Sequence, residues 1–202
     1  MVTLCGKGAP SIAAARAFSC RVLGVDGNPP FVIAARKRAG DLGLSARCRF
    51  ETGDLRAKLK PGRPFDLVIF TAMGDLLGSI EETVAALRGT VAAGGLIYIE
   101  DGYLKTAGPP PPGYGYAQTK PETLRALTAH GDLILAERLW SDRELRALNH
   151  RNNEAIRRRA RLLSERFPEK RPEIEAYVTR QEQECTNLET CLVTASWLLK
   201  RS

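Results

Sequence analysis

Short apolar runs alternate with longer segments of helical composition along the first 100 residues. The runs are almost continuously apolar, as at 65–70, where Asp66 is the one charged residue. Strands that are buried on both faces of a parallel sheet show this pattern. We therefore expect an α/β fold with a mostly parallel sheet flanked by helices. The strands are expected at residues 21–25, 46–52, 65–70 and 96–99 after an apolar start at 1–5, and the helices at 12–18, 31–42 and 79–91.

Local signals support these boundaries. Ser11 is a predicted N-cap, and Pro29 and Pro30 stand where a helix can begin. The pair Gly94-Gly95 is expected to close the third helix, and Asp101-Gly102 is interpreted as a turn after the strand at 96–99.

The second half of the chain has a different pattern. Residues 108–113 contain four consecutive prolines and predict a stiff loop. A short helix at 121–129 and a strand at 133–139 follow, and a last strand is expected at 191–199. Between these two strands the pattern is helical, with breaks near Phe167-Pro168 and Arg171-Pro172. We expect one domain over residues 1–202, with a helical insertion at about 141–190 before the last strand.

Composition narrows the class of protein. The 202 residues are 44% hydrophobic and 26% charged, which is typical of a globular chain. No apolar run is long enough to cross a bilayer and no secretory signal is recognised, so a cytoplasmic location without a membrane partner is expected. The five cysteines are scattered and form no CxxC pair, so neither a disulfide framework nor a metal site is predicted. The net charge of +7 is spread along the chain instead of forming a basic arm.

A glycine loop and two acids are the strongest functional signal. Gly6 and Gly8 lie between an apolar strand and a helix, where backbone N–H groups can approach an anionic ligand. Asp26 ends the next strand, about 20 residues on, and can accept hydrogen bonds from the hydroxyls of a ribose. Asp54 follows the third strand at the same edge of the sheet. Two alternatives stay open: the glycines form only a tight corner, or Asp26 caps the helix that follows it.

Four sequence blocks carry a family resemblance. Cys-Gly-Lys-Gly-Ala-Pro-Ser-Ile-Ala, Arg-Val-Leu-Gly-Val-Asp-Gly, Gly-Asp-Leu and Phe-Asp-Leu-Val-Ile-Phe occur in order and at the right spacing. They resemble class I S-adenosylmethionine-dependent methyltransferases of the small-molecule type, most clearly over residues 1–104. The resemblance implies a Rossmann-like fold, S-adenosylmethionine as cofactor, and methyl transfer to oxygen, nitrogen or carbon of a small-molecule acceptor. The last strands resemble the reversed strand pair of that family.

The resemblance also implies the cofactor-binding residues. The loop would line the methionine part, Asp26 would hold the ribose, and Thr71 would lie under the sulfonium end. Asp54 and the backbone of Leu55 would contact the adenine. The predicted cofactor-binding set is Cys5 (by its backbone), Gly6, Gly8, Asp26, Gly27, Asp54, Leu55 and Thr71.

Two departures from the family pattern concern the start of the chain. Val2 stands where the family has an acid, and Leu4 where it has its first glycine. The chain also begins inside the first strand, whereas the family has one or two helices before it. These departures fit a chain truncated at its N-terminus, a mis-set start or a degenerate family member, and the sequence does not choose among the three. A catalytically impaired cofactor-binding relic or partner subunit is the first alternative function.

No catalytic residue is predicted. Asp75, Glu100, Asp101 and Tyr103 are candidates for a general base because they lie near strand ends, and none is preferred. His130 and His150 have no partner at a diagnostic spacing. Ser11 occupies the third glycine position of a dinucleotide-binding GxGxxG motif, which argues against a dehydrogenase.

An arginine-rich stretch raises the question of nucleic acid. Glu154 and Glu165 interleave with its arginines, so a solvated helix with ion pairs is favoured and RNA methylation is the second alternative. The arginines are Arg151, Arg157, Arg158, Arg159 and Arg161. Tyr114, Tyr116 and Trp140 are candidates for lining an acceptor pocket, although Trp140 equally suits a core position. The sequence does not indicate an oligomeric state.

Overall fold

The computed structural model describes residues 2–59, 64–71 and 74–202, with residues 2–4 described by their backbone alone. The chain divides into two compact units. The sheet unit comprises Met1–Asp101, Pro121–Glu137 and Ser196–Ser202, and the hairpin unit comprises Gly102–Lys120 and Arg138–Ala195.

One seven-stranded sheet has the order β3-β2-β1-β4-β5-β7-β6. The strands are β1 (Val2–Leu4), β2 (Val22–Asp26), β3 (Cys48–Thr52), β4 (Phe65–Thr71), β5 (Val91–Leu104), β6 (Leu133–Leu139) and β7 (Leu192–Lys200). The pairs β1–β2, β2–β3, β1–β4 and β4–β5 are parallel. Strand β7 runs against β5, since Gly94 bonds Arg201 near one end and Lys105 bonds Cys191 near the other. The predicted mostly parallel α/β sheet is confirmed.

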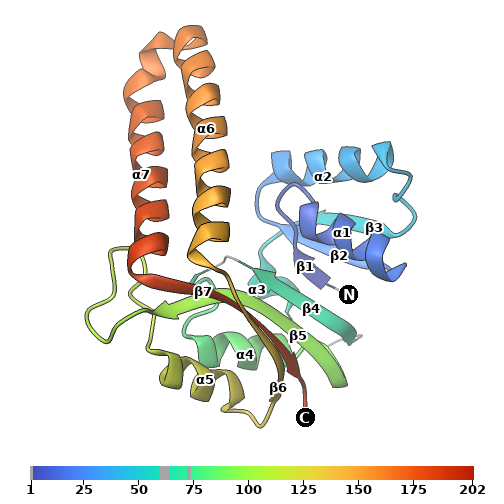
Figure 1. Cartoon of the computed structure of the whole chain (residues 1–202). Helices are drawn as coiled ribbons and strands as arrows, with labels where there is room; N and C mark the ends of the chain where they lie inside the picture. The colour runs from blue at the N-terminus through green and yellow to red at the C-terminus, as the bar shows by residue number, and fades with distance from the viewer. Residues whose placement is uncertain (1, 60–63, 72–73) are drawn as a thin grey trace. The chain divides into compact units, whose positions relative to one another are not determined.

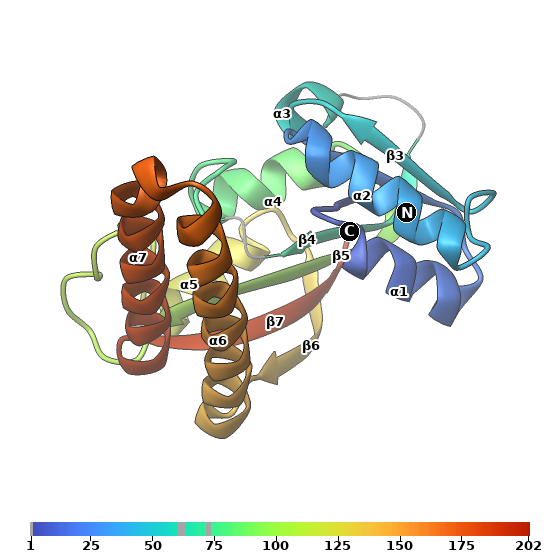
Figure 2. The ribbon, with the colours of Figure 1, turned by 90° about the horizontal axis from the view of Figure 1, so that it is seen from above.

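The helices of the sheet unit cover both faces of its strands (Figures 1 and 2). Helices α1 (Ala9–Phe18) and α2 (Pro29–Asp41) lie on one face, and α4 (Ile80–Arg88) and α5 (Lys120–Thr128) lie on the other. The short α3 (Leu55–Lys58) follows β3. Strand and helix alternate from β1 to β5, as right-handed crossovers between parallel strands require.

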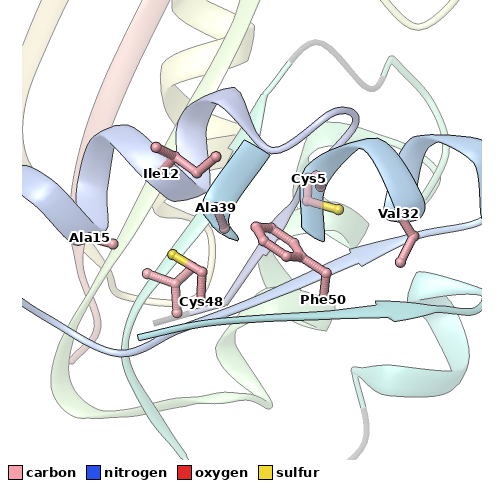
Figure 3. Packing of buried hydrophobic residues seen from close by; sticks show 9 residues of the cluster. Cys5, Ile12, Ala15, Val32, Ala39, Cys48 and Phe50 are labelled. Carbon is pink, nitrogen blue, oxygen red and sulfur yellow. The ribbon is translucent and has the colours of Figure 1, made fainter. Parts of the chain in front are cut away.

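The core under α1 and α2 holds the start of the glycine loop in place (Figure 3). Cys5 and Phe50 are 1% and 2% exposed and pack in one cluster with small and β-branched side chains of α1 and α2. Gly24 of β2 lies directly under them: a Cβ there would come within 2.5 Å of Phe50 Cδ1 and 2.7 Å of Cys5 Cβ. The absence of a side chain at Gly24 therefore lets the Phe50 ring and Cys5 pack against the strand.

The hairpin unit contains two long helices side by side, α6 (Asp142–Arg166) and α7 (Arg171–Thr190), joined by a 3₁₀ turn at Pro168–Lys170 (Figure 1). A capping box of Ser141 and Glu144 begins α6. Five half-buried positions of α7 repeat at alternating spacings of four and three residues, as in the seam of an antiparallel helix pair. They are Ile174, Val178, Gln181, Cys185 and Leu188, and Glu182, Asn187 and Glu189 beside them are also at least half-buried. The predicted helical insertion and its breaks are confirmed.

Three local predictions are wrong. Gly8, not Ser11, is the N-cap of α1, and Ser11 is buried inside the helix. Gly94-Gly95 lies within β5, which already begins at Val91, because backbone bonds to Arg201 hold both glycines in the strand. Asp101-Gly102 is also part of β5 and not a turn.

Candidate functional site

The glycine loop after β1 is a tight corner with one open side. Gly6 and Gly8 have φ angles of 48° and 86°, which favour glycine. The Gly8 N–H donates to the Cys5 carbonyl at 2.7 Å, and a Cβ at Gly8 would lie 3.0 Å from Ala35 Cβ. A Cβ at Gly6 would meet nothing within 4 Å. Gly8 is thus required by packing of α1 on α2, while Gly6 faces free space.

The carboxylate of Asp26 is fixed by two backbone donors. The Gly6 N–H donates to Oδ2 at 2.9 Å, and the Asn28 N–H donates to Oδ1 at 2.8 Å. The N-cap of α2 is Asn28, so the alternative of Asp26 as the helix cap is wrong. A carboxylate offers about four lone-pair positions, and two of them are used here. The half-buried Asp26 can therefore accept two further hydrogen bonds from a ligand.

The Gly53 N–H donates to the Asp26 carbonyl at 3.0 Å, and this bond places the following residue, Asp54, next to Asp26. Its carboxylate caps α3 by accepting from the Arg56 N–H at 2.9 Å, and it also contacts Arg56 Nε at 3.2 Å. The backbone and side-chain hydrogen bonds from Arg56 lower the pKa of Asp54. Sequence reasoning missed Arg56 as a partner of Asp54, although the arginine stands only two residues after that acid.

A cavity of about 490 Å³ borders Arg56. Its lining comprises Arg56, Leu59, Asp75, Leu76, Leu77, Gly78 and Ala86. The side chain of Leu55 is buried, so this residue can offer a ligand only its backbone. The cavity therefore adjoins Asp54 only through Arg56, whose side chain contacts the Asp54 carboxylate.

A second hollow, of about 750 Å³, is lined by Phe18, Cys20, Phe65 and neighbouring residues at the other end of the strands. It contains none of the predicted cofactor-binding residues. Its larger volume is therefore no reason to move the candidate site there.

Thr71 ends β4 opposite Glu100 of β5. Side chains of paired residues in a parallel ladder project from the same face, and neighbouring strands lie about 4.8 Å apart. Glu100 Oε2 accepts hydrogen bonds from Tyr98 and Ser196, each at 3.4 Å. Sequence reasoning missed Tyr98 and Ser196, since the contact joins β5 to the distant β7. The predicted segment after Thr71 includes Ala72 and Met73, which lie outside the described residues.

The other candidate groups do not gather at this edge. His150 lies 3.3 Å from Glu154 on the exposed side of α6, and His130 is exposed. All five cysteines are free. Burial, and then the charge of Asp26, raise the pKa of Cys5 to about 11, which keeps the thiol protonated at neutral pH.

The arginine-rich helix has partners within the hairpin unit. Arg157 Nε lies 2.6 Å from Glu182 Oε1 of α7. The Tyr114 and Tyr116 rings are 6.1 Å apart, and Arg138 lies 4.5 Å above the Trp140 ring. No helix in the described part of the chain is long and apolar enough to cross a membrane.

The strand order, the glycine loop and the acid at the end of β2 agree with the Rossmann-like fold that the sequence resemblance implies. Residues 3–95 match the family model of a methyltransferase domain. The resemblance inferred from the sequence is thereby confirmed. A search of curated proteins found no match.

Solved structures show the same fold over the whole chain. The S-adenosylmethionine-dependent methyltransferase of Thiobacillus denitrificans is 18% identical, with a TM-score of 0.81, and 100% of this chain covers 84% of it. The corresponding enzyme of Geobacter sulfurreducens is 19% identical, with a TM-score of 0.82, and 83% of it is covered by 100% of this chain. Both are in complex with S-adenosyl-L-homocysteine. The [4+2]-cyclase SpnF is also similar, at 19% identity and a TM-score of 0.75, with 99% of this chain and 73% of that chain covered.

Proposed function

We propose that this protein binds S-adenosylmethionine and transfers its methyl group to a small-molecule acceptor. The observation that carries the proposal is the Asp26 carboxylate, which two backbone N–H groups orient while it keeps capacity for two more hydrogen bonds. The vicinal hydroxyls of a ribose match that capacity. The free cysteines support a reducing, cytoplasmic setting.

In this proposal the cofactor lies along the carboxyl ends of β1 to β4. The Cys5 backbone, Gly6 and Gly8 line its methionine part, with Gly6 facing free space. Asp26 and Gly27 hold the ribose. The remaining members of the set act further along the edge: Asp54 and the Leu55 backbone contact the adenine, and Thr71 lies under the sulfonium.

The cofactor supplies an electrophilic methyl group on a positively charged sulfur. Methyl transfer is an in-line displacement, so the main demand on the protein is alignment of the acceptor atom with the methyl–sulfur bond. The rigid loop and the strand ends meet this demand by fixing the position of the sulfur relative to β4 and β5.

Calorimetric titration with S-adenosylmethionine and S-adenosylhomocysteine tests the proposal. We expect micromolar binding by the wild type and at least tenfold weaker binding by Asp26→Ala, because hydrogen bonds to a charged acceptor are lost. Asp41→Ala is the matched control, since Asp41 lies on α2 with a side chain that is 60% exposed. A folded wild type that binds neither ligand would refute the proposed function.

The departures at Val2 and Leu4 favour one second candidate, an impaired relic that binds cofactor poorly. Restoring the family pattern with Val2→Asp and Leu4→Gly then raises the affinity for S-adenosylhomocysteine at least several-fold. An unchanged affinity would contradict the alignment of this loop with the family motif.

A further inference from the structure

A carboxylate, a phenol and a hydroxyl meet on one face of the sheet unit, next to the end of β4. The ladder pairs Ile69 with Tyr98 and Thr71 with Glu100, so Thr71, Tyr98 and Glu100 project from the same face. Ser196 of β7 donates to Glu100 Oε2 at 3.4 Å from the other side, and the Tyr98 hydroxyl donates to the same oxygen at 3.4 Å. Glu100 is thus the meeting point of three strands.

The environment of Glu100 differs from that of a structural carboxylate. Asp132 in the same unit is 2% exposed and is paired with Arg88, as burial of a charge requires. Glu100 is half-buried, and none of the ion pairs among the described residues includes it. The hydrogen bonds described for it both fall on Oε2 and are long. The other oxygen, Oε1, accepts none of the hydrogen bonds described for Glu100, so it keeps the capacity to accept one from a ligand.

The neighbouring candidates lack this placement. Asp101 follows Glu100 in the strand and, by alternation, projects from the opposite face. Tyr103 is 6% exposed, with the Lys120 ammonium 5.5 Å from its ring. Asp75 is exposed in the turn after β4.

We infer that Glu100 is the carboxylate that binds the acceptor, and that the acceptor is therefore an amine or a hydroxyl compound. This inference rests on the proposed function, which puts the sulfonium end beside Thr71. Glu100 accepts a hydrogen bond from the N–H or O–H of the acceptor and takes its proton. The acceptor lone pair forms the bond to the methyl carbon, the carbon–sulfur bond breaks, and its electron pair stays on the sulfur as a neutral thioether. Tyr98 is a positioning residue, because its hydroxyl orients the carboxylate through Oε2.

The charge of Glu100 also sets what is excluded. A carboxylate acceptor would bring a second negative charge to the same face, with no described cation to compensate it. Compounds that carry only a carboxylate are therefore not substrates.

Sinefungin provides a test that needs no knowledge of the acceptor, because an amine replaces the methyl-bearing sulfonium of the cofactor. Its ammonium should lie against Glu100, so the wild type should bind sinefungin more tightly than S-adenosylhomocysteine. We expect Glu100→Gln to reduce this preference about tenfold while the affinity for S-adenosylhomocysteine changes less than about twofold. Glu81→Gln, in the first turn of α4, is the matched control.

A methyl-transfer assay on a panel of small amines, phenols and carboxylic acids completes the test. Amines or phenols should be methylated, and Glu100→Gln should lower their kcat/KM by at least about 100-fold. An unchanged sinefungin preference in Glu100→Gln, or turnover of carboxylic acids alone, would overturn the inference while leaving the proposed function intact. Failure of the wild type to bind S-adenosylhomocysteine would instead refute the proposed function itself.

Discussion

The contact between Gly24 and the Phe50 ring yields a quantitative prediction about the core that supports the glycine loop. In Gly24→Ala the new Cβ would lie 2.5 Å from Phe50 Cδ1 and 2.7 Å from Cys5 Cβ. Carbon atoms in contact prefer about 3.5–4.0 Å, so the ring would have to move by about 1 Å. Phe50 and Cys5 are almost fully buried, and such overpacking costs about 1–3 kcal/mol. Because two contacts become too short at once, we expect the free energy of unfolding to fall by about 2–3 kcal/mol and the Tm to fall by roughly 4–12 °C.

Urea denaturation followed by far-UV circular dichroism measures this effect. Gly27→Ala is the matched control, because its Cβ would meet nothing within 4 Å, and its stability should change by less than about 0.5 kcal/mol. Replacing the ring as well, in Gly24→Ala with Phe50→Leu, should be less destabilising than the sum of the single changes by about 1 kcal/mol or more. Equal stability of Gly24→Ala and wild type, or strict additivity, would refute the reasoning.

Three further predictions concern titration, a buried ion pair and a helix cap. Burial and the charge of Asp26 raise the pKa of Cys5 from 9.0 to about 11. The protonated thiol therefore contributes fully to stability below pH 9, and this contribution is lost as the pH rises through 11. In urea titrations over that range, the free energy of unfolding of the wild type should fall by about 2–3 kcal/mol more than that of Cys5→Ala. Asp132→Ala leaves the Arg88 guanidinium without its carboxylate partner and should lower the free energy of unfolding by about 3 kcal/mol. The double variant Asp132→Leu with Arg88→Met should recover most of this stability. Equal losses of stability in the two variants would contradict this account. Ser141→Ala removes the acceptor for the Glu144 N–H and should cost about 1 kcal/mol, seen as faster hydrogen exchange confined to the first turn of α6.

Local sequence signals were sufficient where one short segment determines the structure. The start of the helical segment at Ser141, the break at Pro168 and the strand of continuous apolar residues around Val68 all follow from residues adjacent in the chain. The same holds for Asp26, whose place at the end of β2 depends on the length of a single strand. These are the elements that the sequence predicted correctly.

Predictions failed where a distant segment decides the local conformation. Gly94-Gly95 has the composition of a helix exit, yet Arg201, more than 100 residues later, bonds both glycines into β5. Ser11 is a good N-cap residue, but the close packing of Gly8 against Ala35 moves the start of α1 to the glycine loop. Propensity describes the segment alone, and tertiary hydrogen bonds and packing override it.

The same limit explains why the acceptor side of the site was less predictable than the cofactor side. Asp26 is positioned by the Gly6 and Asn28 backbones, and both belong to loops with recognisable sequence patterns. Glu100 is oriented by Ser196, on a strand that reaches β5 only after the whole helical insertion, and no local pattern marks that pairing. Backbone donors also fix a carboxylate without the rotamer freedom of side-chain partners, so Asp26 is the more preorganised of the two acids. Substitution of a hydrogen-bond partner should therefore change the orientation of the Glu100 carboxylate more than that of Asp26. We expect Ser196→Ala to alter the preference for sinefungin without changing the affinity for S-adenosylhomocysteine.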